Sequence, residues 1–249
     1  MANVYIDVGH GGKDPGAVDG RQNDPLYTAE KDVNLGIGLA LNAALARCNI
    51  PRRLSRAGDT YPTLTQRSSA ANSWPATIFV SVHCNAHTDG SDARGIEILH
   101  YPGSTKGIAL GNAIMPFVTA VSPWADRKVR PDTRGLHVLS ATKMPAVIVE
   151  YGFLTHTAEE ALLATHAYQV QLAEATARGV CKYLGVAYVA PVGPTPPPVV
   201  TPPVTPPADP HIAEIATLKA EVAQLTADVA LKQAALDNLK VRIRQAIEA

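Results

Sequence analysis

The sequence predicts an α/β domain over residues 1–188, followed by a proline-rich linker and a C-terminal helix. Short apolar runs rich in β-branched residues alternate with stretches of helical periodicity as far as residue 188, which is the pattern of α/β folds. Of the 249 residues, 46% are hydrophobic and 18% are charged, so the chain can bury a core and is not wholly disordered. Ten of the 20 prolines fall within residues 191–210, so the composition itself divides the chain.

Four apolar runs are expected to form the strands of this domain. They are residues 4–6, 78–82, 96–99 and 146–149, with a weaker candidate at residues 52–54. Their β-branched residues favour strands over fragments of helix.

Helices are expected between these runs. The first extends from Thr28, a candidate N-cap, to about Arg47, with apolar residues every three or four positions. The second covers residues 63–72 and ends before a Trp-Pro pair, because the residue preceding a proline disfavours helix. The third covers residues 107–120, although Pro116 argues against its second half, and residues 157–184 hold one or two more.

Residues 189–210 predict an extended linker. Their density of prolines cannot form a helix or an interior strand, and a polyproline spacer extends by about 3.1 Å per residue. A ligand for a proline-binding domain is the alternative, which the absence of a flanking arginine disfavours.

Residues 211–249 predict a coiled-coil helix through which the chain forms a homo-oligomer. Apolar residues recur every seven positions and again three positions later, as in the seam of a coiled coil. The first series is Ile215, Val222, Val229, Leu236 and Ile243, and the second is Leu218, Leu225, Lys232, Leu239 and Ala246. The alternative is an amphipathic helix that folds back onto the first domain or pairs with itself only in crystals.

Charge and cysteine content narrow the class of protein. The 22 basic and 22 acidic residues balance. A protein that binds nucleic acid by releasing counterions is normally basic, so we do not expect nucleic acid as a partner. The three cysteines, Cys48, Cys84 and Cys181, form no C-x-x-C pair, which favours a reducing compartment. No signal peptide is visible, and no apolar window approaches the roughly 18 residues of a membrane span, so we expect no membrane insertion.

Polar residues follow three predicted strands or open the helix that faces them. His10, His83 and Glu150 come just after apolar runs, and Glu30 lies in the first turn of the first helix. The carboxyl ends of strands form the site in open α/β sheets, so these four side chains are expected to converge. Taken singly, a histidine at a strand end or a glutamate near a helix dipole has an ordinary structural explanation.

Two imidazoles and one carboxylate are a recognised catalytic zinc set that leaves the fourth position for water. A further carboxylate kept off the metal would complete a hydrolase by accepting a proton from that water. The residues alone leave open which glutamate takes which role.

Four blocks of sequence carry a resemblance to a known family. They read DVGHGGKDPGA at 7–17, EKDVNL at 30–35, SVHCNA at 81–86 and PAVIVEYGFLT at 145–155. In this order they resemble the zinc-dependent N-acetylmuramoyl-L-alanine amidases of the Amidase_3 type, over about residues 2–185. Two small departures are His156, where Asn is common, and Cys84, where Ala is common.

The resemblance implies the residue roles and completes the fold. It implies that His10, Glu30 and His83 bind one zinc ion and that Glu150 is the catalytic carboxylate. A second group, Arg67, Asn85 and Glu97, would contact substrate, support the site or serve only in structural hydrogen bonds. The implied architecture is a twisted, largely parallel sheet of about six strands flanked by helices.

The resemblance also implies an activity. Peptidoglycan is the expected substrate, cut at the amide between N-acetylmuramic acid and L-alanine by zinc-activated water. Without a visible signal peptide, the chain is expected to be a bacteriophage endolysin that stays in the host cytoplasm until its release to the cell wall. The alternatives are a bacterial autolysin or cell-separation amidase whose signal was removed, and another zinc-dependent amide hydrolase.

Overall fold

The computed structural model describes residues 2–18, 28–87 and 93–191. Six strands and six helices are found within these ranges. In chain order they are β1 (Val4–Val8), α1 (Glu30–Arg47), β2 (Arg52–Leu54), α2 (Leu64–Ser73), β3 (Ile78–Asn85), β4 (Ile96–His100), α3 (Thr105–Ala120), β5 (Asp126–Pro131), α4 (His137–Ser140), β6 (Ala146–Phe153), α5 (Thr157–Leu163) and α6 (His166–Leu184). The predicted linker beyond residue 191 and the predicted coiled coil at 211–249 lie outside the described residues.

All strands pair in one sheet of order β2-β1-β3-β6-β4-β5. The first four of these are parallel, whereas β4 runs antiparallel to β6 and parallel to β5. This confirms the largely parallel, six-stranded α/β sheet. The pattern does not predict β5, because Val129 is the only aliphatic residue among its six.

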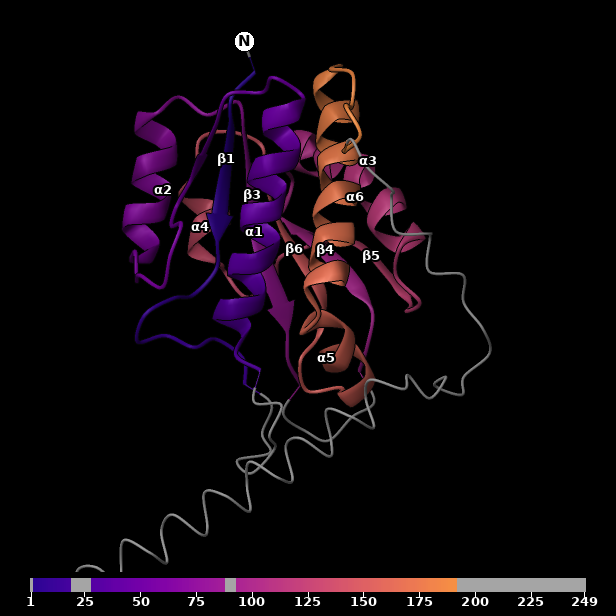
Figure 1. The fold of residues 1–249 in the computed structure, drawn as a ribbon. Coiled ribbons are helices and arrows are strands. Elements are labelled where there is room, and N and C mark those ends of the chain that lie inside the picture. The colour runs from indigo at the N-terminus through magenta and orange to yellow at the C-terminus, as the bar shows by residue number, and fades with distance from the viewer. Residues whose placement is uncertain (1, 19–27, 88–92, 192–249) are drawn as a thin grey trace, which may run out of the picture. The chain divides into compact units, whose positions relative to one another are not determined.

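Helices cover both faces of the sheet (Figure 1), with α1, α3 and α6 on one face and α2 and α4 on the other. Alternate strand residues serve the two layers, as the period of a strand requires. On β3, for example, Val80 and Val82 join the core beneath α1 and α6, while Phe79 joins the smaller core beneath α2 and α4. His83 on β3 and Glu150 on β6 lie an even number of positions beyond residues of this smaller core, so their side chains lie on the face of the sheet that α2 and α4 cover.

Helix boundaries follow the prediction with two corrections. Ala29, not Thr28, is the N-cap of α1, and it makes no side-chain capping bond. The carbonyl of Ala17 instead accepts the first amide of the helix, from Glu30, at 2.9 Å. The second correction concerns α3, which continues through Pro116, since buried side chains such as Ile114 and Val118 hold its second half.

The remaining helices agree with the pattern or escape it. Thr63 caps α2 with a capping box to Gln66. The segment 157–184 divides into α5 and α6 at Thr165, which caps the second helix. The single turn α4 is too short to show a helical period. None of the helices in the described ranges combines the length and apolar character that a bilayer crossing requires.

Candidate metal centre and active site

His10 lies in a tight turn directly after β1, where it adopts a φ of +57°. Gly9 and Gly16, before and after it in the sequence, leave room for the neighbouring side chains of the site. A Cβ on Gly9 would lie 2.4 Å from the His83 ring, and one on Gly16 would lie 2.5 Å from a Glu30 carboxylate oxygen. The glycine-rich block around His10 therefore allows the backbone to approach the site closely.

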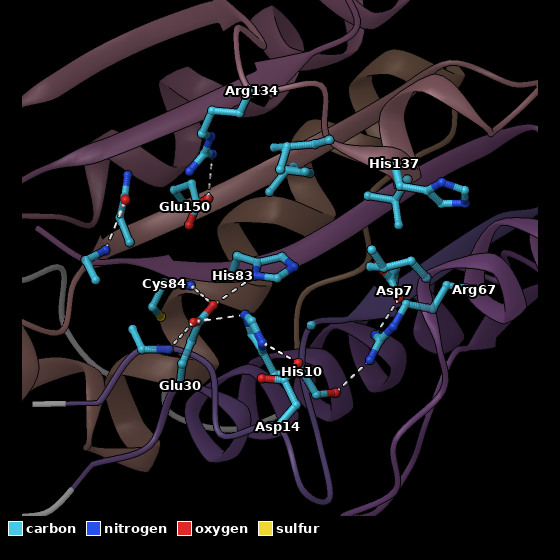
Figure 2. Close-up of a pocket in the computed structure, with 18 of the residues that line it drawn as sticks. Asp7, His10, Asp14, Glu30, Arg67, His83, Cys84, Arg134, His137 and Glu150 are labelled. Carbon is cyan, nitrogen blue, oxygen red and sulfur yellow. Dashed lines mark hydrogen bonds and ion pairs between the residues drawn. The ribbon is translucent and has the colours of Figure 1, made fainter.

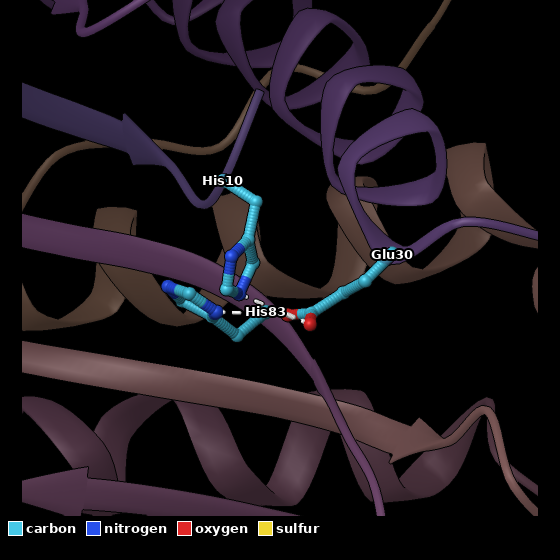
Figure 3. A group of neighbouring side chains, drawn as sticks. All are labelled: His10, Glu30 and His83. Atoms are coloured by element: carbon cyan, nitrogen blue, oxygen red, sulfur yellow. Dashed lines mark hydrogen bonds and ion pairs between the residues drawn. The ribbon is translucent and has the colours of Figure 1, made fainter. Parts of the chain in front are cut away.

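Glu30 connects the two imidazoles. It is the first residue of α1 and is 3% exposed. Its Oε2 lies 3.0 Å from His10 Nε2 and its Oε1 lies 2.8 Å from His83 Nδ1 (Figure 3). The backbone N–H groups of Ala17 and Cys84 donate to the same carboxylate at 2.8 and 3.0 Å. The carboxylate is thus oriented by backbone from two distant segments.

These three side chains could hold a metal ion, because one ligand atom from each lies within 4.8 Å of the others. Asp14 adds a support that the sequence assignment did not include: its Oδ2 lies 2.9 Å from His10 Nδ1. A carboxylate on the far nitrogen fixes the orientation of a histidine ligand and leaves Nε2 directed at the centre. Two nitrogens and one carboxylate in this arrangement match a catalytic zinc donor set.

The charges of the cluster are strongly coupled. Burial disfavours protonated His10, but its contacts with Glu30 and Asp14 outweigh burial and raise the pKa of His10 to about 9. Burial lowers the pKa of His83, but its hydrogen bond and charge interaction with Glu30 outweigh burial, so this pKa is raised as well. Burial would raise the pKa of Glu30, yet hydrogen bonds from the two imidazoles hold it well below its usual range. A cation is therefore favoured next to this carboxylate.

Glu150 lies on β6 next to this cluster but outside it. It is 5% exposed, and Arg134 Nη2 approaches its Oε1 at 3.6 Å (Figure 2). Its Oε2 is buried without a hydrogen-bond partner among the described residues. Burial raises the pKa of Glu150 to about 7, against the opposing effects of His83 and Arg134. A carboxylate with that pKa can exchange a proton near neutral pH.

His10, Glu30, His83 and Glu150 line one open cavity of about 510 Å³. In Figure 2, Arg134 extends toward Glu150 on the side opposite Glu30 and Asp14. The structure thus brings together all four residues that the sequence assigns to zinc binding and catalysis. Arg134 belongs to a loop without periodicity, so no sequence signal marks it.

Arg67, which the sequence assigns to substrate or to support, is 3% exposed. It donates to Asp7 Oδ1 at 2.8 Å and to the carbonyl of His10 at 2.7 Å, and it also bonds the carbonyl of Val8. These contacts hold the end of β1 and the turn that carries His10. Arg67 is therefore placed to position a candidate ligand.

Asn85 and Glu97 contact each other rather than the metal cluster. Asn85 Nδ2 donates to Glu97 Oε1 at 2.8 Å. Asn85 lines the large cavity, and both residues line a second, smaller cavity beside it. Cys84 has its side chain in the core beneath α1.

Comparison with known proteins identifies the family. Residues 4–182 match the Amidase_3 family, described as N-acetylmuramoyl-L-alanine amidase. The chain belongs to this family. The resemblance seen in the four sequence blocks is thereby confirmed, as is the expected peptidoglycan amidase activity.

Amidase_3 relatives are found in bacteria and in a phage. The chain is 36% identical over 186 residues to N-acetylmuramoyl-L-alanine amidase CwlM of Bacillus licheniformis, covering 73% of this chain and 68% of that protein. It is 32% identical over 189 residues to the endolysin of Bacillus phage SPP1, covering 74% and 66%. The crystal structure of N-acetylmuramoyl-L-alanine amidase from Clostridium difficile 630 superimposes with a TM-score of 0.68 at 35% identity, covering 74% and 97%.

Proposed function

We propose that this amidase cuts the bond between N-acetylmuramic acid and L-alanine with one zinc ion held by His10, Glu30 and His83 and with Glu150 as the acid-base group. The observation that carries the proposal is the convergence of three ligand atoms within 4.8 Å beside a separate, buried carboxylate. A metal site with three protein ligands leaves a position for water, as a hydrolase requires.

Zinc at this site would lower the pKa of a water molecule to about 7 and polarise the carbonyl of the lactyl group. Glu150 then accepts a proton from the attacking water, and its pKa of about 7 suits that transfer at neutral pH. The same carboxyl group returns the proton to the amine of L-alanine, so the peptide leaves as a neutral amine. Asp14 and Arg67 hold His10 in place while this occurs.

Mass spectrometry of purified peptidoglycan digested by the full chain with zinc tests this proposal. The expected products carry new L-alanine N-termini and no new reducing sugar ends. A product cut inside the glycan or the peptide would contradict the assigned bond. Metal analysis of the purified protein should return one zinc ion per chain, and a different resident metal would contradict the cofactor assignment.

A phage lysin is the biological role that we favour over a bacterial autolysin. The phage SPP1 endolysin is among the relatives. The three cysteines are free and buried, which accords with folding in a reducing host cytoplasm before release to the cell wall. Expression in a host with and without a membrane-permeabilising partner distinguishes the roles, because a lysin should lyse cells only when the membrane is opened. Lysis without that partner would favour an exported autolysin.

A further inference from the structure

The second cavity is lined by basic side chains and adjoins the catalytic cavity. It has a volume of about 210 Å³, and three arginines, Arg127, Arg130 and Arg134, line it. Arg134 and Asn85 line both cavities, so the two spaces meet at these residues. Arg134 is also the residue that approaches Glu150. One substrate molecule could therefore extend from Glu150 into the second cavity.

Strand register places this cavity in line with the catalytic residues. His83 is paired with Glu150 across β3 and β6, and Glu150 is paired with Glu97 across β6 and β4. Directly paired residues lie on the same face of a sheet. A single row thus runs from a candidate metal ligand, through the acid-base group, to the floor of the arginine-lined cavity.

A β-bulge in β5 directs two arginines to the same acidic residue. Ile96 pairs with Asp126 and Ile98 with Val129, so β5 carries one extra residue opposite Glu97. Lys128, inside the bulge, has a φ of +77°, a backbone conformation that is unfavourable for residues other than glycine. Side chains alternate along a regular strand, so residues three apart would point to opposite faces.

Because of the extra residue, the side chains of Arg127 and Arg130 lie on the same face of the sheet. Arg127 Nε and Arg130 Nη1 lie 3.4 and 3.3 Å from Glu97 Oε2. Within the described part of the chain, the other guanidinium nitrogens of the two arginines have no hydrogen-bond partner. Their side chains are 32% and 54% exposed, and Arg127 also stacks on Phe153 with its Cζ 5.0 Å from the ring centroid. Glu97 therefore holds two arginines that still present unused donors to the cavity.

The charge of the cavity favours an anion. Three arginines are opposed by Glu97 and by Asp132, and the Asp132 carboxylate already accepts backbone N–H bonds from Arg134 and Leu136. Paired, planar donors of this kind bind carboxylates well. In a muramyl peptide the acetylated sugars are neutral and the lactyl carboxyl is tied up in the scissile amide, so the free carboxylates lie on the peptide.

We infer that this cavity is a subsite for the free carboxylate on the second residue of the stem peptide, and that Arg127 and Arg130 bind it. The inference rests on the proposed function and adds the direction in which the substrate lies: sugar over the large cavity, peptide toward β5. Two strand spacings separate β6 from β5 by about 10 Å. An extended dipeptide covers about 7 Å of this distance, and the arginine side chains reach across the rest.

Two synthetic muropeptides that differ only at this group, with a carboxylate or a carboxamide on the second residue, test the inference. The full chain should have a lower KM for the carboxylate form. Arg130→Gln should raise that KM about 5-fold, the effect of one half-exposed charge pair, with kcat unchanged and the carboxamide form unaffected. Arg130→Lys, which keeps the charge, should recover part of the loss. Arg53→Gln, on β2 at the other edge of the sheet, is the matched control and should change neither substrate.

Binding without turnover separates this inference from the proposed function. Calorimetry on the full chain carrying Glu150→Gln should give tighter binding of the carboxylate form, with the preference lost when Arg130→Gln is added. Equal affinities for the two forms, or an equal loss for both in Arg130→Gln with unchanged thermal unfolding, would overturn the subsite. A retained binding preference in a chain that releases no L-alanine N-termini would instead overturn the proposed reaction and leave the subsite standing.

Discussion

His83 and Glu150 are direct partners in the parallel ladder between β3 and β6. Both side chains project from the sheet face that α2 and α4 cover, and the same register places a candidate metal ligand next to the candidate acid-base group. The two residues are far apart in the sequence, so the pairing of the strands brings them together. Because each has a separate role in the proposal, substitutions should separate metal binding from chemistry.

Glu150→Gln should keep one metal ion per chain and lower kcat by about 10²- to 10⁴-fold, the usual contribution of an acid-base group. His83→Ala should lose the metal as well as the activity, because it removes one of three ligands. Metal analysis and release of L-alanine N-termini measure the two effects. Full activity in Glu150→Gln would remove this residue from the mechanism.

Metal affinity should fall as the pH is lowered. The pKa of His10 in the metal-free cluster is raised to about 9 and that of His83 is raised also, so below pH 9 a metal ion must displace protons to bind. Between pH 6 and pH 8 we expect the Kd of the metal to decrease at least about 10-fold for each unit by which the pH is raised. This follows because binding releases one or more protons. Titration against a competing chelator measures this, and a Kd independent of pH would show that the imidazoles bind no proton in the free protein.

Gly9→Ala should weaken metal binding without any change in the ligands themselves. The new methyl group would lie 2.4 Å from the His83 ring, so the ring must move. Gly58→Ala is the matched control, because nothing lies within 4 Å of its Cβ position. Zinc titration of the two variants makes the comparison. Equal affinities would mean that the turn can shift at no cost to the site.

Arg134→Gln should move the acidic limb of the activity profile to higher pH. Burial raises the pKa of Glu150 and Arg134 partly opposes this, so removing the cation raises that pKa further. The base is active when deprotonated, and activity should therefore require a higher pH than in the unaltered chain. The pH dependence of kcat/KM on a carboxamide substrate measures the shift. A limb that stays in place would mean that Arg134 does not interact with ionised Glu150.

Removal of residues 190–249 should convert an oligomer into a monomer. The heptad pattern of 211–249 predicts association, and the described catalytic domain has its own hydrophobic core. Light scattering of the full and shortened chains, with circular dichroism as a check on folding, measures this. Identical monomer masses would refute the coiled coil and favour a helix that folds back on the first domain.

The sequence by itself predicted most of the elements and, through the family resemblance, the four residues of the proposed site. Apolar runs rich in β-branched residues predicted four of the six strands, with β2 as a weaker candidate, and the block around His10 contains the glycines that the packing of the site requires. Local signals of this kind depend on neighbouring residues, so they can be read directly. The strand β5 escaped because its residues are mostly exposed and charged, and the length of α3 escaped because core packing outweighs the cost of Pro116.

Tertiary structure decided which distant residues meet. The contacts of Arg134 with Glu150 and of Arg67 with the carbonyl of His10 join segments far apart in the sequence, whose spacing follows no period. The order of the strands and the register between them set these contacts, and a bulge of one residue in β5 brings Arg127 and Arg130 to the same face. A pattern along one strand cannot encode its partner, because register depends on the fit of the whole sheet to its two helical layers.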